Sequence, residues 1–98
     1  MKNAEYITKA MNQETFELRD MENFYTWEET QPFMIEVGKQ ARKIAQAHED
    51  SFIAKMMMKE IENDYFKALH ADCGFTMHAS ASHAMGYFKE MIKTFGIN

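Results

Sequence analysis

The chain has 98 residues, of which 46% are hydrophobic and 27% are charged, and its net charge is −4. This length fits one domain, this hydrophobic content excludes a disordered chain, and the single proline and four glycines provide too few turns for an all-β fold. With a lone cysteine, no visible signal peptide and no apolar run near the about 20 residues that cross a bilayer, we expect one cytoplasmic all-α domain over residues 1–98.

The charge is unevenly distributed along the chain. Residues 1–36 hold eight acids and three bases, whereas residues 37–98 hold seven acids and eight bases. Lys and Arg do not cluster along the sequence, so direct binding to nucleic acid is not expected. The acidic residues at the front of the chain either face a protein partner with a basic or apolar surface or solvate the outside of a helix.

Residues 4–27 have the periodicity of an amphipathic helix, with weak helix formers near residues 12–15 that favour a break there. Phe24 and Trp27 fall off the apolar stripe, so they pack either in the domain core or against a partner. The stripe consists of Ile7, Ala10, Met11, Leu18, Met21 and Tyr25. Residues 28–32 then form a boundary, at which Pro32 suits a first helical turn and Thr30 or Gln31 would cap it.

Residues 33–69 favour helix throughout, but one helix of this length would span more than about 50 Å. It either breaks at residues 48–51, with Asp50 or Ser51 capping a new helix, or continues beyond the core and packs against a second copy. The expected apolar residues are Val37, Ala41, Ile44, Ala45 and His48, followed by Ile53, Met57, Ile61, Tyr65 and Leu69. Because the second set winds around the helix, we expect an unbroken or mildly bent long helix in a homodimer.

Residues 72–80 lose the helical period and contain Gly74, which predicts a connection between two helices. Ser80 or Ser82 would cap the last helix, which Gly96 would end. Its apolar stripe consists of Ala84, Phe88, Met91, Ile92 and Phe95. A short connection returns this helix antiparallel to the long one, so the fold is a small bundle of three to four helices.

Ten methionines include three consecutive ones, which cannot all face a single core. Methionine is common both as a core filler and on adaptable binding surfaces, so at least one of the three is expected at the surface. Together with the acidic residues and the aromatic residues off the stripe, this predicts a partner-binding surface. Its residues are Glu17, Asp20, Glu22, Phe24, Trp27, Glu28, Glu29, Met56 and Met58.

Four potential zinc ligands occur in the stretch HADCGFTMHASASH, with the pattern H-x2-C-x4-H-x4-H. They are His70, Cys73, His78 and His83. The spacing, and the glycine after the second ligand, resemble the zinc knuckle, although two of its usual cysteines are histidines here. The stretch is therefore either a zinc site or a hinge between two helices with histidines at their ends.

The sequence contains no motif of an established enzyme class. At the C-terminal end of a helix, Cys73 would have a raised pKa, which is unfavourable for a nucleophile. We therefore expect a non-enzymatic module for protein–protein interaction, of the kind that viruses and mobile elements use to inhibit a host protein complex. The alternative is a zinc-binding module that uses residues 70–83.

Overall fold

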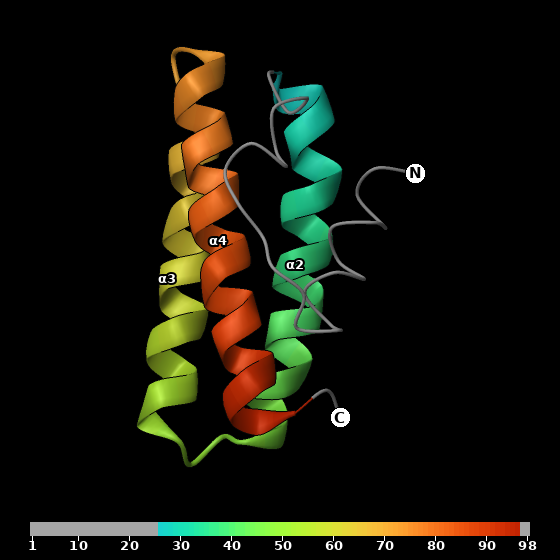
Figure 1. Ribbon diagram of the computed structural model, residues 1–98, viewed down its shortest axis with the longest axis vertical. Coiled ribbons are helices and arrows are strands. Elements are labelled where there is room, and N and C mark those ends of the chain that lie inside the picture. The colour runs from blue at the N-terminus through green and yellow to red at the C-terminus, as the bar shows by residue number, and fades with distance from the viewer. Residues whose placement is uncertain (1–25, 97–98) are drawn as a thin grey trace.

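The computed structural model describes residues 26–96, which form three α-helices and no strand. These are α2 (Trp27–Ala47), α3 (Phe52–Leu69) and α4 (Gly74–Phe95). Figure 1 shows the helices side by side, with α4 packed against both α2 and α3. The expected all-α bundle is thus confirmed for this part of the chain, and the helix expected within residues 4–25 lies outside it. No helix in the described part is long and apolar enough to cross a membrane.

Helix α2 begins earlier than the sequence indicated, and the expected boundary at residues 28–32 is wrong. Thr26 is the N-cap, and its hydroxyl oxygen accepts a hydrogen bond from the backbone N–H of Glu29 at 3.3 Å. Glu28 and Glu29 lie in the first turn, where carboxylates interact favourably with the helix dipole. These contacts start the helix before Pro32, which lies inside it.

The expected continuous helix over residues 33–69 is also wrong, because α2 ends at Ala47 and α3 begins at Phe52. The hydroxyl of Ser51 caps α3 by accepting a hydrogen bond from the N–H of Ala54 at 3.2 Å. This capped break allows α3 to turn back and pack against α2 within one chain. The helix overhang that suggested a homodimer is therefore not present.

The connection before the last helix is shorter than expected, because α4 begins at Gly74 and not after residue 80. Cys73 is its N-cap, and Ser80, one of the two expected caps, is buried within the helix. The predicted end is confirmed: Gly96 has a φ of 82° and its N–H donates to the carbonyl of Ile92. A glycine suits this position because other residues rarely adopt positive φ.

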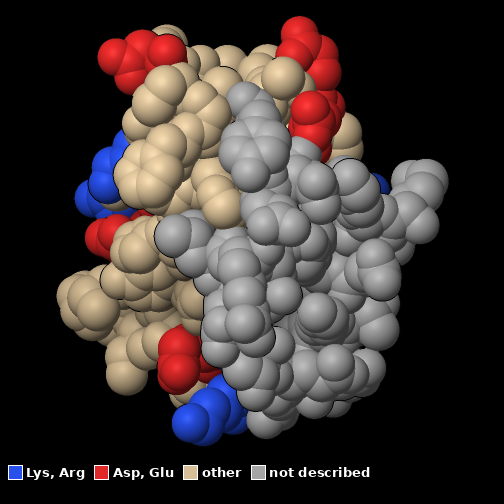
Figure 2. All heavy atoms as spheres, turned by 45° about the horizontal axis from the view of Figure 1, so that its top comes forward, with Lys and Arg blue, Asp and Glu red and all other residues tan. Residues whose placement is uncertain are grey.

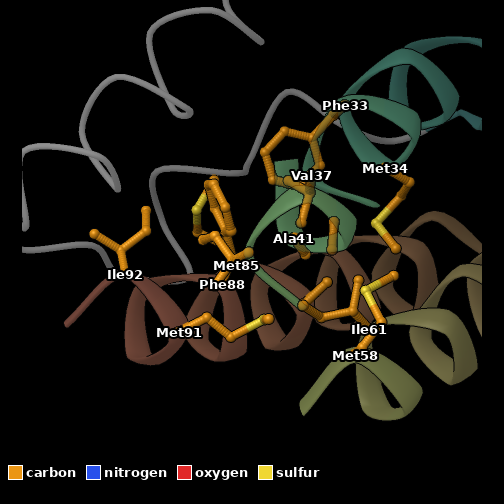
Figure 3. Close-up of a cluster of buried hydrophobic side chains, with 13 residues drawn as sticks. Phe33, Met34, Val37, Ala41, Met58, Ile61, Met85, Phe88, Met91 and Ile92 are labelled. Atoms are coloured by element: carbon orange, nitrogen blue, oxygen red, sulfur yellow. The ribbon is translucent and has the colours of Figure 1, made fainter. Parts of the chain in front are cut away.

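The core lies where the three helices meet. In Figure 3, Phe33 and Val37 of α2 extend toward Met85 and Phe88 of α4, and Met34 lies toward Met58 and Ile61 of α3. The full cluster is Phe33, Met34, Val37, Ala41, Ile44, Met58, Ile61, Ala81, Ala84, Met85, Phe88, Met91 and Ile92. Most of the stripe predicted for the last helix is therefore confirmed as core.

The predicted apolar face of the second half of the long helix is only partly correct. Ile61 is buried, but Ile53 and Leu69 are exposed. The buried face of α3 instead consists of Ala54, Met58, Ile61, Asp64 and Ala68. The helix is thus rotated relative to the prediction, which leaves several large apolar side chains of α3 at the surface.

Candidate interaction groove

An open groove runs between α2 and α3, which we call the α2–α3 groove. Its volume is about 590 Å³, which lies in the range of ordinary ligand-binding clefts. Its described lining residues are Met34, Ile35, Gly38, Lys39 and Arg42 of α2 and Met58, Ile61, Glu62, Tyr65 and Phe66 of α3. None of them belongs to α4, so the groove opens on a side of the α2–α3 pair that α4 does not cover.

The floor of the groove is apolar and fixed by the core. Met34, Met58 and Ile61 are buried core residues that also line the groove. On either side, Ile35 is 51% exposed and Phe66 is 58% exposed. Burying such side chains in a complex is favourable by about 25 cal/mol for each Å² of apolar surface. The groove thus has an apolar floor and two large side chains available for contact.

Aromatic side chains are grouped where the start of α2 meets the end of α3. The rings of Trp27 and Tyr65 meet edge to face with their centroids 5.5 Å apart, and Tyr65 and Phe66 are 6.0 Å apart in a similar geometry. Tyr65 and Phe66 line the groove, so Trp27 lies directly beside it. Aromatic residues are enriched in the centres of protein interfaces.

The structure places the predicted partner-binding residues in several different settings. Trp27 lies beside the groove, whereas Met58 is in the core and reaches the groove only as part of its floor. Met56 is the exposed member of the methionine run, as expected for at least one of the three. Outside the described residues lie Glu17, Asp20, Glu22 and Phe24.

The remaining two predicted residues, Glu28 and Glu29, are exposed in the first turn of α2. Both carboxylates interact favourably with the positive end of the helix dipole, which is a structural reason for their presence. On the face drawn in Figure 2, the described carboxylates lie in separate places and uncharged side chains cover most of the described surface. The described carboxylates therefore do not form a single acidic patch on that face.

The four candidate zinc ligands are distributed along the α3–α4 connection and α4. His70 is the exposed C-cap of α3, Cys73 is the exposed N-cap of α4, His78 is buried in α4, and His83 is paired with Asp64 of α3. Within residues 26–96, no group of three or more His, Cys, Asp or Glu side chains is placed to hold one metal ion. The structure thus does not bring the four residues together.

The position of Cys73 reverses the expected effect on its thiol. The residue lies at the N-terminus of α4, not at the C-terminus of a helix, and its Sγ is 3.3 Å from the hydroxyl oxygen of Thr76. Hydrogen bonds from the Thr76 side chain and backbone lower the pKa of the thiol. The expectation of a raised pKa is therefore wrong.

A buried carboxylate lies on the other side of α3, facing α4. The Asp64 side chain is 2% exposed, and its two oxygens are 2.7 and 2.9 Å from Nδ1 of His83, whose side chain is 50% exposed. The ring of Tyr87 packs against the imidazole at 4.9 Å. Burial raises the pKa of Asp64, and the hydrogen bond from His83 offsets part of this effect. The pair joins α3 and α4 with a polar contact.

Sequence reasoning missed several residues of these sites. Asp64 is three residues after Ile61 and lies on the same buried face, so an acid at a core position was the signal for a polar partner. Ile35 and Phe66 were visible as large apolar residues outside the buried stripes. Their pairing across a groove depends on the break at residues 48–51, which determines how α2 and α3 align.

Comparisons of this chain with protein-family models, with curated proteins and with solved structures found no match.

Proposed function

We propose that this protein is a non-enzymatic interaction module that binds a segment of a partner protein in the α2–α3 groove. The observation that supports the proposal is the exposure of Ile35 and Phe66 on the two sides of an apolar floor. Large apolar side chains exposed on both sides of a groove are typical of binding sites. A helix or loop of the partner that is bound in the groove could not bind elsewhere. In this way the module would inhibit a protein complex.

The geometry favours a protein segment as the occupant. Two antiparallel helices with an apolar floor between them form the type of surface on which amphipathic helices dock, because a third helix can align along the groove. Zinc binding, the alternative function, has no comparable support, since the four candidate ligands are not gathered in one place.

The test is an affinity capture from cells that express the protein naturally, with a groove variant and a matched control. Phe66→Glu places a charge in the groove, whereas Phe75→Glu changes an equally large side chain that is 71% exposed at the start of α4. The proposal expects a partner that is captured by the wild type and by Phe75→Glu but lost with Phe66→Glu. A partner retained by Phe66→Glu at wild-type levels would contradict it.

A photo-crosslinking residue at position 35 or position 75 identifies the occupant directly. Position 35 is expected to link to the same captured partner, and position 75 is not. A covalent dimer of this chain from position 35, together with light scattering that shows a dimer, would mean that a second copy occupies the groove. The homodimer expected from the sequence is thus tested by the same experiment.

A further inference from the structure

The charges beside the α2–α3 groove are mainly positive. Lys39 and Arg42 line the groove from α2, and Glu62 lines it from α3. On α3, Lys59 and Lys55 lie three and seven residues before Glu62, which places all three on one side of the helix. Glu28 lies seven residues before the lining residue Ile35 and so on the same side of α2, which makes four cations and two carboxylates beside the groove, although the whole chain carries a net charge of −4.

These cations are available to a partner. All four are exposed, and none of them forms an ion pair within residues 26–96. Long cationic side chains next to an apolar floor can neutralise carboxylates while their stems cover apolar surface. The groove thus combines an apolar centre with a basic margin, and both features point to the same kind of ligand.

The dimensions fit a short helix. The groove-lining part of α2 runs from Met34 to Arg42, which at 1.5 Å per residue spans about 12 Å, or about two helical turns. Gly38 lies in the middle of this part, and a Cβ there would meet no atom within 4 Å. A partner side chain can therefore approach the α2 backbone closely at this position.

We infer that the α2–α3 groove binds an acidic amphipathic helix of a partner protein, with an apolar stripe on the floor and carboxylates beside Lys39 and Arg42. This inference rests on the proposed function and adds the chemistry of the partner. Electrostatic complementarity of this kind determines which partners bind and how fast they associate. A symmetric dimer through the same groove is disfavoured, because the basic margin of one chain would face the same basic margin of the second chain.

The test uses two helix-stabilised peptides of about 15 residues with the same leucine stripe, one flanked by Glu and the other by Lys. Fluorescence anisotropy measures their binding to the full chain. We expect the Glu peptide to bind at least about tenfold more tightly than the Lys peptide, and to weaken as salt is raised. The double variant Lys39→Glu, Arg42→Glu should reverse this preference.

Matched variants separate this inference from the proposed function. Lys43→Glu changes an exposed cation of α2 that does not line the groove, so it should leave the preference for the Glu peptide within about twofold. Equal binding of both peptides, lost in Phe66→Glu, would overturn the acidic preference but leave the proposed groove function intact. Binding of neither peptide up to about 1 mM, or binding that Phe66→Glu does not weaken, would overturn the inference. The capture and crosslinking experiment then decides the proposed function by itself.

Discussion

The Nδ1 atom of His83 lies 2.7 and 2.9 Å from the two carboxylate oxygens of Asp64 and joins α4 to α3 at the edge of the core. A carboxylate that is 2% exposed needs such a partner, because an unpaired charge in this position would lose its hydration without compensation. The pair therefore contributes to how α3 and α4 align.

The pH dependence of stability should report on Asp64. Burial raises the pKa of Asp64 above its usual value of 3.8, so the folded state favours the protonated carboxyl group. Its contribution to the free energy of unfolding is fully present below pH 3.8 and is lost as the pH rises through the raised native pKa. The side chain of Asp64→Asn does not titrate, so wild type should lose stability relative to this variant across that window.

Urea unfolding of both proteins from about pH 3 to about pH 8 at constant salt measures this difference, in which the titration of groups other than His83, the direct partner of Asp64, largely cancels. A difference that stays constant with pH, or that favours the wild type increasingly as the pH rises, would show that burial does not dominate at this carboxyl group.

Removal of the imidazole should destabilise the fold without any metal being involved. His83→Ala leaves the buried carboxylate of Asp64 without its side-chain hydrogen bond, which is expected to cost about 1–3 kcal/mol. His70→Ala is the matched control, because this exposed histidine at the end of α3 should change stability by less than about 0.5 kcal/mol. Urea unfolding with and without a chelator is the measurement. Equal losses in the two variants, present only without chelator, would instead indicate a shared metal.

The capped break between α2 and α3 predicts whether replacing Ser51 by alanine stabilises or destabilises the protein. Ser51→Ala removes the hydroxyl that accepts a hydrogen bond from the N–H of Ala54, and should cost about 1 kcal/mol. In a continuous helix the same change would stabilise, because alanine has the higher helix propensity. Ser82→Ala, inside α4, is the control and should be neutral or stabilising by a few tenths of a kcal/mol. A gain in Ser51→Ala would contradict the break.

Two phenylalanines of α4 test how the helix packs. Phe88 is buried between the helices, so Phe88→Ala should cost about 3–5 kcal/mol, while Phe75→Ala on the exposed side should change stability by less than about 0.5 kcal/mol. Thermal and urea unfolding measure both. Similar small effects in the two variants would mean that α4 does not pack through the face that contains Phe88.

The sequence predicted the helical class and most of the α4 stripe because apolar residues recur there at helical spacing and Gly96 supplies a clear stop. It did not predict the register of α3, since Ile53 and Leu69 fit a helical stripe as well as the residues that are buried. Only the packing of α3 against two helices selects the face that contains Asp64. The helix starts at Trp27 and Phe52 depend on the side-chain caps Thr26 and Ser51, worth about 1 kcal/mol each, a small signal beside the helical composition on both sides. The sequence offered Ser51 as a cap only as the alternative to a continuous helix.

The histidine-rich stretch was harder to interpret because one composition fits two structures. Ligand spacing along the chain resembles a zinc site, but a helix that starts at Gly74 places Cys73 at its N-terminus and His78 and His83 on its body. The α2–α3 groove could not be predicted either, because it needs the alignment of Ile35 with Phe66 across two helices. Both residues could be recognised in the sequence as apolar residues outside the stripes. Their position on opposite sides of one groove could not.

The thiol of Cys73 provides a last test of where α4 begins. The side chain and backbone of Thr76 form hydrogen bonds with the thiol and lower its pKa, since a hydroxyl or N–H that donates to a thiolate stabilises the charged form. Thr76→Val removes the hydroxyl and should raise the pKa, whereas Thr76→Ser keeps it and should leave the pKa close to that of the wild type. Because the chain has one cysteine, the rate of alkylation by iodoacetamide as a function of pH reads this thiol alone. The same midpoint in all three proteins, at or above that of a free cysteine, would place Cys73 away from the N-cap of α4.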